Sequence, residues 1–205
     1  MTPTRRTILR LGTVVAAFAA LTVVWPPGRA GALTTDLVAE GRRALDADKV
    51  DEAIAILERA VAADPNDAAA LAWLGSARVR KARTASVFTA PGWVKKGFNT
   101  LDEAVERFPD AFVVYMVRGT TALRVPDFFK KTPVAISDLS AVVAMKERSP
   151  AAVPDSVMPS VYLNLGLAYK KNGQTAEARA TWERGTRLYP SAPEAGAIAK
   201  ELRSL

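Results

Sequence analysis

The chain has 205 residues, of which 28 are Lys or Arg and 21 are Asp or Glu, and it contains neither His nor Cys. This length is enough for one ordinary domain with a buried core. Without Cys, disulfides, thiolate nucleophiles and Cys-based zinc or iron–sulfur centres are excluded, and without His the commonest base and metal ligand is missing. We therefore expect no metal site and no cofactor.

The positive charge is concentrated at the N-terminus. Residues 1–32 contain four arginines and no acid, so residues 33–205 carry 24 basic against 21 acidic side chains. Proteins that bind nucleic acid gather basic side chains on one face. Because most of the excess charge lies in the first residues, we expect no nucleic-acid partner.

The N-terminal segment has the three parts of an export signal. A basic stretch, 1–10, precedes the uncharged and mostly apolar stretch 11–25, and Pro-Pro-Gly then leads to the small residues Ala30-Gly31-Ala32. A helix of 15 residues rises about 22 Å, which is less than the ~30 Å hydrocarbon core. We expect cleavage near Ala32. The alternative is that residues 8–25 stay attached and contact the membrane.

The arginine pair lies within a motif-like stretch. Thr4-Arg5-Arg6-Thr7-Ile8-Leu9-Arg10 resembles the twin-arginine export motif, with Ile8 in place of the usual Phe and Arg10 in place of Lys. General secretion is the alternative route. Either route places the body of the protein in the bacterial periplasm, or on the periplasmic side of the inner membrane if the leader is retained.

The body of the chain contains an internal repeat. Gly41, Gly75, Gly119 and Gly166 lie in similar surroundings, and a small residue follows Gly41 and Gly166 after the same spacing. The pattern continues with a large residue and a proline in both places, at Leu57 and Pro65 and at Trp182 and Pro190. This pattern resembles the tetratricopeptide repeat (TPR), a helix–turn–helix unit of about 34 residues.

The resemblance implies an all-α fold, an α-solenoid of four TPR-like hairpins with a C-terminal capping helix in a domain at 34–205. The units are expected at 34–67, 68–111, 112–158 and 159–192, followed by the capping helix at 192–205. The outer units follow the family pattern closely. The two middle units depart from it, because they carry insertions at 81–100 and 124–131.

The family resemblance also implies a concave groove lined by the first helix of each unit. A basic edge at Arg80, Arg124 and Lys171 beside an apolar floor favours a protein or peptide partner with acidic and apolar side chains. The alternative is that this edge is only solvated. The predicted groove residues are Arg42, Asp46, Ser76, Arg80, Met116, Thr120, Arg124, Leu163, Leu167, Lys170 and Lys171.

Both insertions combine aromatic and basic residues. They are candidate docking loops for a partner or for anionic lipid, and the candidate contacts are Trp93, Lys95, Lys96, Phe128 and Phe129. The alternative, which we favour for 81–100, is that its aromatics pack over the gap between the two helices. Adjacent Phe128 and Phe129 cannot both face one side of an extended loop, so we expect one to be exposed.

Enzymatic function finds little support in the sequence. No glycine-rich phosphate or dinucleotide motif is present, and acidic pairs such as Asp51-Glu52 begin predicted helices, where they complement the helix dipole. We therefore expect no catalytic residue. A cryptic Ser–Lys hydrolase site remains the less favoured alternative to an exported, non-catalytic interaction module.

Overall fold

The computed structural model describes residues 27–205, with side chains from Thr34 onward, and within this range it contains helices and no strand. The predicted export signal therefore lies largely outside the described residues. The helices are α1 (Pro27–Asp46), α2 (Val50–Ala63), α3 (Ala68–Lys81), α4 (Ala90–Arg107), α5 (Phe112–Arg124), α6 (Thr132–Arg148), α7 (Met158–Lys171), α8 (Thr175–Leu188) and α9 (Ala195–Arg203), with the 3₁₀ turns η1 (Asp127–Phe129), η2 (Pro150–Ala152) and η3 (Asp155–Val157).

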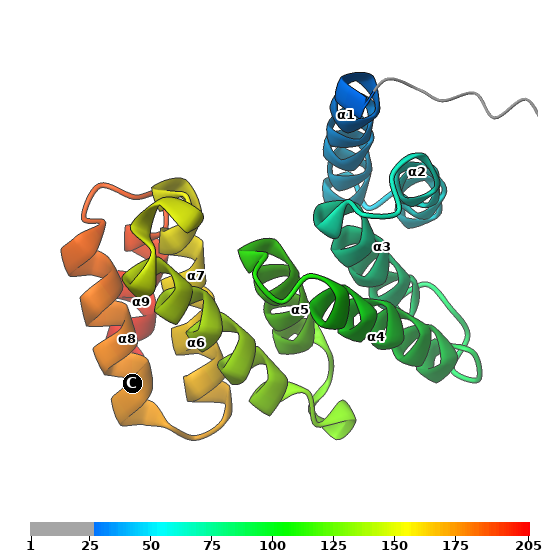
Figure 1. Ribbon diagram of the computed structural model, residues 1–205. Helices are drawn as coiled ribbons and strands as arrows, with labels where there is room; N and C mark the ends of the chain where they lie inside the picture. Colours follow the sequence, from blue (N-terminus) through cyan, green and yellow to red (C-terminus); the bar gives the residue numbers. More distant parts are fainter. Residues whose placement is uncertain (1–26) are drawn as a thin grey trace, which may run out of the picture.

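These helices form the predicted solenoid. Each repeat unit is a hairpin of two packed helices, α1 with α2, α3 with α4, α5 with α6 and α7 with α8. Successive hairpins pack on one another through α2 and α3, α4 and α5, and α6 and α7, so the chain advances along one direction (Figure 1). The prediction of an α-solenoid of four hairpins with a capping helix is confirmed.

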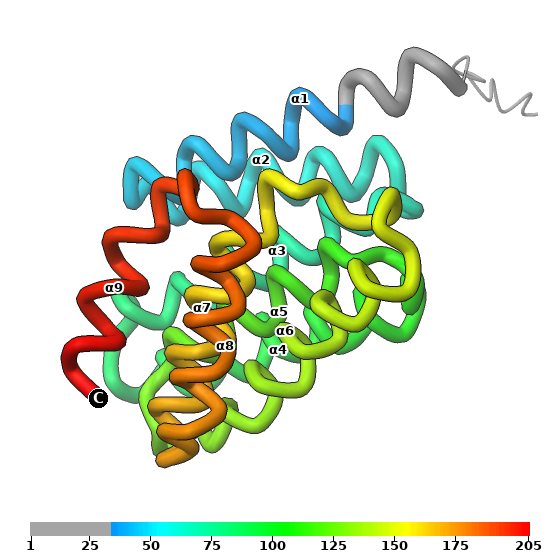
Figure 2. The backbone as a smooth tube through the Cα atoms, turned by 90° about the vertical axis from the view of Figure 1, so that its left-hand side faces the viewer, coloured from blue at the N-terminus to red at the C-terminus, as the bar shows by residue number. Residues whose placement is uncertain are grey.

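The apolar core is distributed along the solenoid. Separate clusters of buried side chains join the first and second units, the second and third, and the third and fourth. A last cluster, built on Ala178, Trp182 and Ile198, joins the fourth unit to α9. Helix α9 thus covers the end of the solenoid, beside α7 and α8 (Figure 2). This arrangement is typical of repeat proteins, in which each unit contacts its neighbours and the last needs a cap.

Close helix packing explains why one repeat glycine is required. A Cβ atom on Gly166 of α7 would lie 2.1 Å from Nε1 of Trp182 on α8. The indole is fully buried against this glycine and donates a hydrogen bond to the Leu163 carbonyl at 3.1 Å. Trp182 therefore fills the space that a side chain at position 166 would need.

A buried ion pair joins the middle units. Arg118 on α5 donates to both carboxylate oxygens of Asp138 on α6 at 2.8 Å, and to Asp102 on α4 at 2.8 Å. Asp138 is only 2% exposed, and this burial raises the pKa of its carboxyl group, while the hydrogen bonds from Arg118 oppose the rise. The guanidinium neutralises a charge that would otherwise be buried alone.

Candidate functional site

A hollow of about 750 Å³ lies where the two insertions meet, and we call it the insertion pocket. Its walls come from the C-terminal ends of α3 and α5, the segment 82–89, the first turns of α4 and the segment 125–129. It is lined by Ser76, Val79, Arg80, Ala82, Arg83, Val87, Ala90, Pro91, Val94, Thr121, Arg124, Val125, Pro126, Phe128 and Phe129.

The first wall is formed by the insertion of the second unit. Most of this insertion lengthens α4, which begins at Ala90 with Pro91 in its first turn, so only 82–89 connects the helices. Proline is favoured at this position because its missing N–H would lack a helical partner anyway. The candidate contacts Trp93, Lys95 and Lys96 therefore lie on a helix, and the expectation that they form a loop is wrong.

The second wall is held in place by the fourth unit. The ammonium of Lys171 on α7 donates to the carbonyls of Leu123 and Val125 at 3.1 and 3.0 Å, and it pairs with the Asp127 carboxylate at 2.9 Å. These contacts satisfy carbonyls at the C-terminal end of α5 and tie η1 to α7. The position of Phe128 and Phe129 thus depends on a residue more than 40 positions away.

Replacement of Lys171 by Met is expected to loosen this wall. The Lys171→Met variant loses the charged hydrogen bonds to α5 and η1, and its stability should fall by about 1–2 kcal/mol because the ammonium is only partly buried. Hydrogen exchange should accelerate at residues 125–131, while residues 84–89 on the opposite wall keep their rates. Unchanged exchange at 125–131 would show that Lys171 does not hold η1.

The floor of the pocket is apolar and its polar groups are paired. Val79, Val94 and Val125 are buried there. Ser76 and Thr121, which are also buried, bond to each other through their hydroxyl groups at 2.9 Å. A ligand entering this floor would therefore be held by apolar contact.

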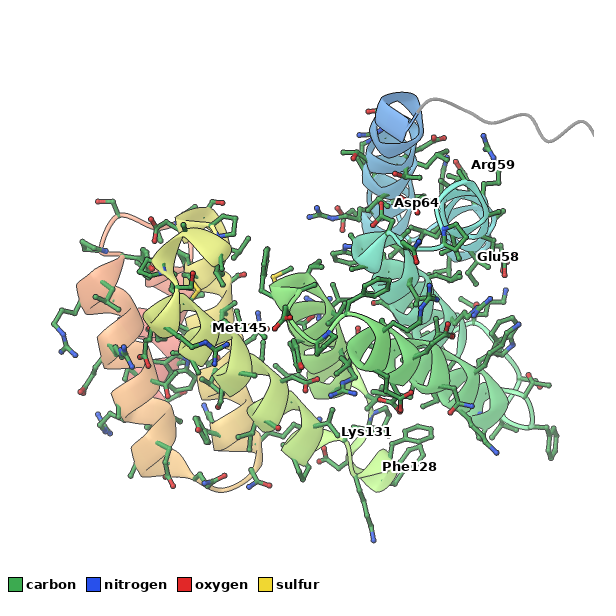
Figure 3. All side chains as sticks on the ribbon, in the orientation of Figure 1. Glu58, Arg59, Asp64, Phe128, Lys131 and Met145 are labelled. Atoms are coloured by element: carbon green, nitrogen blue, oxygen red, sulfur yellow. The ribbon has the colours of Figure 1, made fainter. Side chains whose placement is uncertain are left out.

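The mouth of the pocket carries unusually exposed apolar side chains. Val87 is 78% exposed and Phe128 is 73% exposed, and both line the pocket, while the neighbouring Phe88 is 93% exposed. Figure 3 shows Phe128 at the lower edge of the molecule. Of the described large apolar side chains, these three and Leu188 on α8 are the exposed ones. Val87 and Phe128 therefore make the mouth of the pocket a candidate for contact with a partner.

The aromatic residues of the insertions divide between core and surface. Phe98 is buried in a core cluster, so the packing interpretation holds for it, whereas Trp93 is half-buried on α4 and Phe88 points into solvent. Phe128 is exposed while Phe129 is half-buried, which confirms that one of the pair is exposed. The two rings contact each other in a tilted arrangement, with their centroids 4.3 Å apart.

Two of the three cations of the predicted basic edge are bound within the chain. Arg80 donates to the Leu45 carbonyl at 2.7 Å and lies 3.5 Å from Asp48, and Lys171 holds η1 as described above. Arg124 is exposed at the rim of the pocket and has no ion pair within residues 34–205. The basic edge offered to a partner is therefore narrower than the sequence suggests.

Most of the other predicted groove residues have partners within the described chain. The Arg42 guanidinium lies 4.8 Å from the Trp73 ring centroid, and the half-buried Thr120 donates to the Met116 carbonyl at 2.7 Å. Leu163 and Leu167 pack against the cluster that contains α9, so the capping helix covers them. Asp46 ends α1 and is exposed. Only Ser76, Arg80 and Arg124 of the predicted groove residues line the insertion pocket.

A Ser–Lys contact occurs at the C-terminal end. The Lys170 ammonium donates to Ser204 at 2.8 Å and pairs with the Glu201 carboxylate at 2.9 Å. Both partners of the ammonium belong to α9 or to the residue that follows its last turn. The contact therefore supports packing of α9 and gives no support to a hydrolase.

Among the described residues, no group of acidic side chains is arranged to hold a metal ion. None of the helices formed by residues 27–205 combines the length and the apolar character needed to cross a bilayer.

Comparison with known proteins agrees with this architecture. Tetratricopeptide repeat families match residues 38–85 and residues 159–191, which lie at the two ends of the solenoid. No protein of curated function matches the chain. The described chain is thus an α-solenoid with tetratricopeptide repeats at these two places, a kind of repeat that generally binds protein partners.

Solved structures are similar in fold. A mutant of MamA superposes with a TM-score of 0.52 at 22% identity, over 82% of this chain and 83% of that one. A thermophilic TPR protein of Thermus thermophilus gives 0.50 at 17% identity, over 84% of this chain and 100% of that one. MamA MSR-1 gives 0.50 at 25% identity, over 77% of each chain. At these identities the likeness shows the fold alone.

Proposed function

We propose that the protein is an exported, non-catalytic TPR module that binds a peptide or helix of a partner protein. The insertion pocket, whose lining includes the C-terminal ends of the first helices α3 and α5, is the contact site. The observation that carries this proposal is the exposed apolar cluster at its mouth, with Phe128 and Val87 lining a hollow whose floor is apolar. Apolar surface of this kind is stabilised when a partner covers it.

The contact is tested by photo-crosslinking in the native host. A photoreactive amino acid at position 128 should crosslink to one defined partner protein, because Phe128 lies at the pocket mouth. The same amino acid at position 179, an exposed site on α8, is the matched control and should give no such product. Equal crosslinking at both positions, or none at 128, would contradict binding at the pocket.

Export is proposed from residues 1–32. We expect a cleaved periplasmic protein that starts near Leu33. In the alternative, residues 8–25 remain as a membrane contact and the same TPR domain acts as an assembly factor anchored in the inner membrane. Intact-mass analysis of the soluble and membrane fractions decides between these two forms, since only the anchored form keeps the leader.

The export route is tested by a conservative change. Replacement of Arg5 and Arg6 together by Lys retains the positive charge of the leader but removes the arginine pair. The twin-arginine proposal predicts that this variant accumulates unprocessed in the cytoplasm. A variant exported at the normal rate would instead indicate general secretion.

A further inference from the structure

The size of the insertion pocket indicates an occupant that contributes more than one side chain. A volume of about 750 Å³ lies within the ~300–1,000 Å³ typical of pockets that hold drug-sized ligands. Its buried floor of Val79, Val94 and Val125 can be covered by two or more neighbouring apolar side chains. One anchoring side chain would leave much of this surface uncovered.

The positive charge at the rim of the pocket indicates an occupant that carries an acidic side chain. No acidic residue lines the pocket, whereas Arg80, Arg83 and Arg124 do. The first two share the carboxylate of Asp48, at 3.5 and 3.6 Å. Arg124 has no ion pair among the described side chains and is exposed, so it is the cation available to a partner. A carboxylate placed beside it would form a charge-assisted hydrogen bond.

The backbone amide and carbonyl groups of the occupant must also form hydrogen bonds. An extended peptide would bring unpaired amide and carbonyl groups onto the floor, where the hydroxyls of Ser76 and Thr121 already bond to each other. A helix satisfies its backbone groups internally and presents side chains alone. The apolar floor therefore favours a helix over an extended segment.

The chain itself contains one such contact. On α7, Leu163 and Leu167 pack in the cluster that includes Leu202 of α9. Beside them Lys170, near the end of α7, pairs with Glu201 of α9 at 2.9 Å. An amphipathic helix thus places its apolar face on a first helix of the repeat and its carboxylate on a cation at that helix's C-terminal end. Arg124 occupies the corresponding end of α5.

We propose that the insertion pocket binds an acidic amphipathic helix of the partner. Two apolar side chains one helical turn apart enter between Val87 and Phe128, and an adjacent Asp or Glu pairs with Arg124. This inference rests on the proposed function, because it names the form and chemistry of the segment that the module recognises.

The test is selection from a displayed library of random peptides of about 16 residues, roughly four helical turns, against the full-length protein. The inference predicts an enriched set with apolar residues spaced three or four apart and with flanking acids. Binding of this set should weaken about tenfold in Arg124→Glu, which reverses the rim charge, and clearly in Phe128→Ser. The exposed residues Arg179 and Leu188 on α8 supply matched controls, Arg179→Glu and Leu188→Ser, which should bind normally.

The outcomes separate the inference from the proposed function. Enriched peptides that are proline-rich or basic, or whose binding is unaffected by both pocket variants, would overturn the inference while leaving an interaction module in place. A selection that enriches no binding peptide would contradict the proposed function as well. Circular dichroism of each variant confirms that it is folded before binding is compared.

Discussion

Replacement of Trp182 by Ala is expected to destabilise the protein by about 3–5 kcal/mol, as for other large buried aromatics. The indole is fully buried in the cluster that joins α8 to α9, and its removal leaves a cavity beside Gly166. Urea denaturation of the variant measures the loss. The half-buried Trp93 on α4 provides the matched control, and Trp93→Ala should cost clearly less.

A double-mutant cycle sharpens this prediction. Gly166→Ala alone should be destabilising, because the new Cβ would lie 2.1 Å from the indole nitrogen. In the Trp182→Ala background the clash is gone, and Ala at this helical position should stabilise by up to about 1 kcal/mol. A change of sign is therefore expected. Additive effects of the two substitutions would show that the indole does not fill the space beside Gly166.

Replacement of Arg118 by Met has the second large effect. The variant leaves the Asp138 carboxylate buried without its partner, which should cost about 3–5 kcal/mol at neutral pH. Because the Arg118 hydrogen bonds oppose the rise in the Asp138 pKa, their loss should raise that pKa further. The control variant is Lys49→Met, which removes only the exposed ion pair between Lys49 and Glu52. It should change the free energy of unfolding by less than about 1 kcal/mol.

The loss of folding stability in the Arg118→Met variant should become smaller as the pH is lowered. A carboxyl group whose pKa is raised in the folded state destabilises the fold only while it is ionised. The difference in free energy of unfolding between the variant and the parent protein is therefore largest above the raised pKa. It becomes smaller as the pH falls toward the ordinary pKa of Asp. Chemical denaturation at a series of pH values follows this trend. A stability difference that grows on acidification would contradict its assignment to the buried, ionised Asp138.

The repeat architecture could be predicted because it depends on local spacing. Gly75 and Gly166 each face the second helix of their own hairpin, at Leu101 and Trp182, so small and large residues recur at fixed distances along the chain. A helix–turn–helix unit is completed within a few dozen residues, and its pattern is visible without knowledge of distant contacts.

The candidate site was less predictable because it depends on contacts between units. A docking loop was predicted at 81–100, yet most of this segment lies in α4. Pro91 occupies the first turn of α4, and Gly97 allows α4 to approach Val79 and the Gly75 carbonyl on α3. Their roles become visible only when the helices are packed. The internal use of Lys171 likewise depends on α7 lying beside the end of α5, which no spacing in the sequence reports.

In the proposed function, a partner covers the insertion pocket of an exported protein. Because the chain has no Cys, single cysteines can be placed at Arg83, an exposed residue that lines the pocket and is not one of the proposed partner contacts, and at the exposed control position Leu188. In intact cells, a maleimide that reaches the periplasm but does not cross the inner membrane should label position 188 and spare 83, whereas both positions label rapidly in the purified protein. Equal labelling of the two positions in cells would contradict a covered pocket, and absence of labelling at 188 would contradict export.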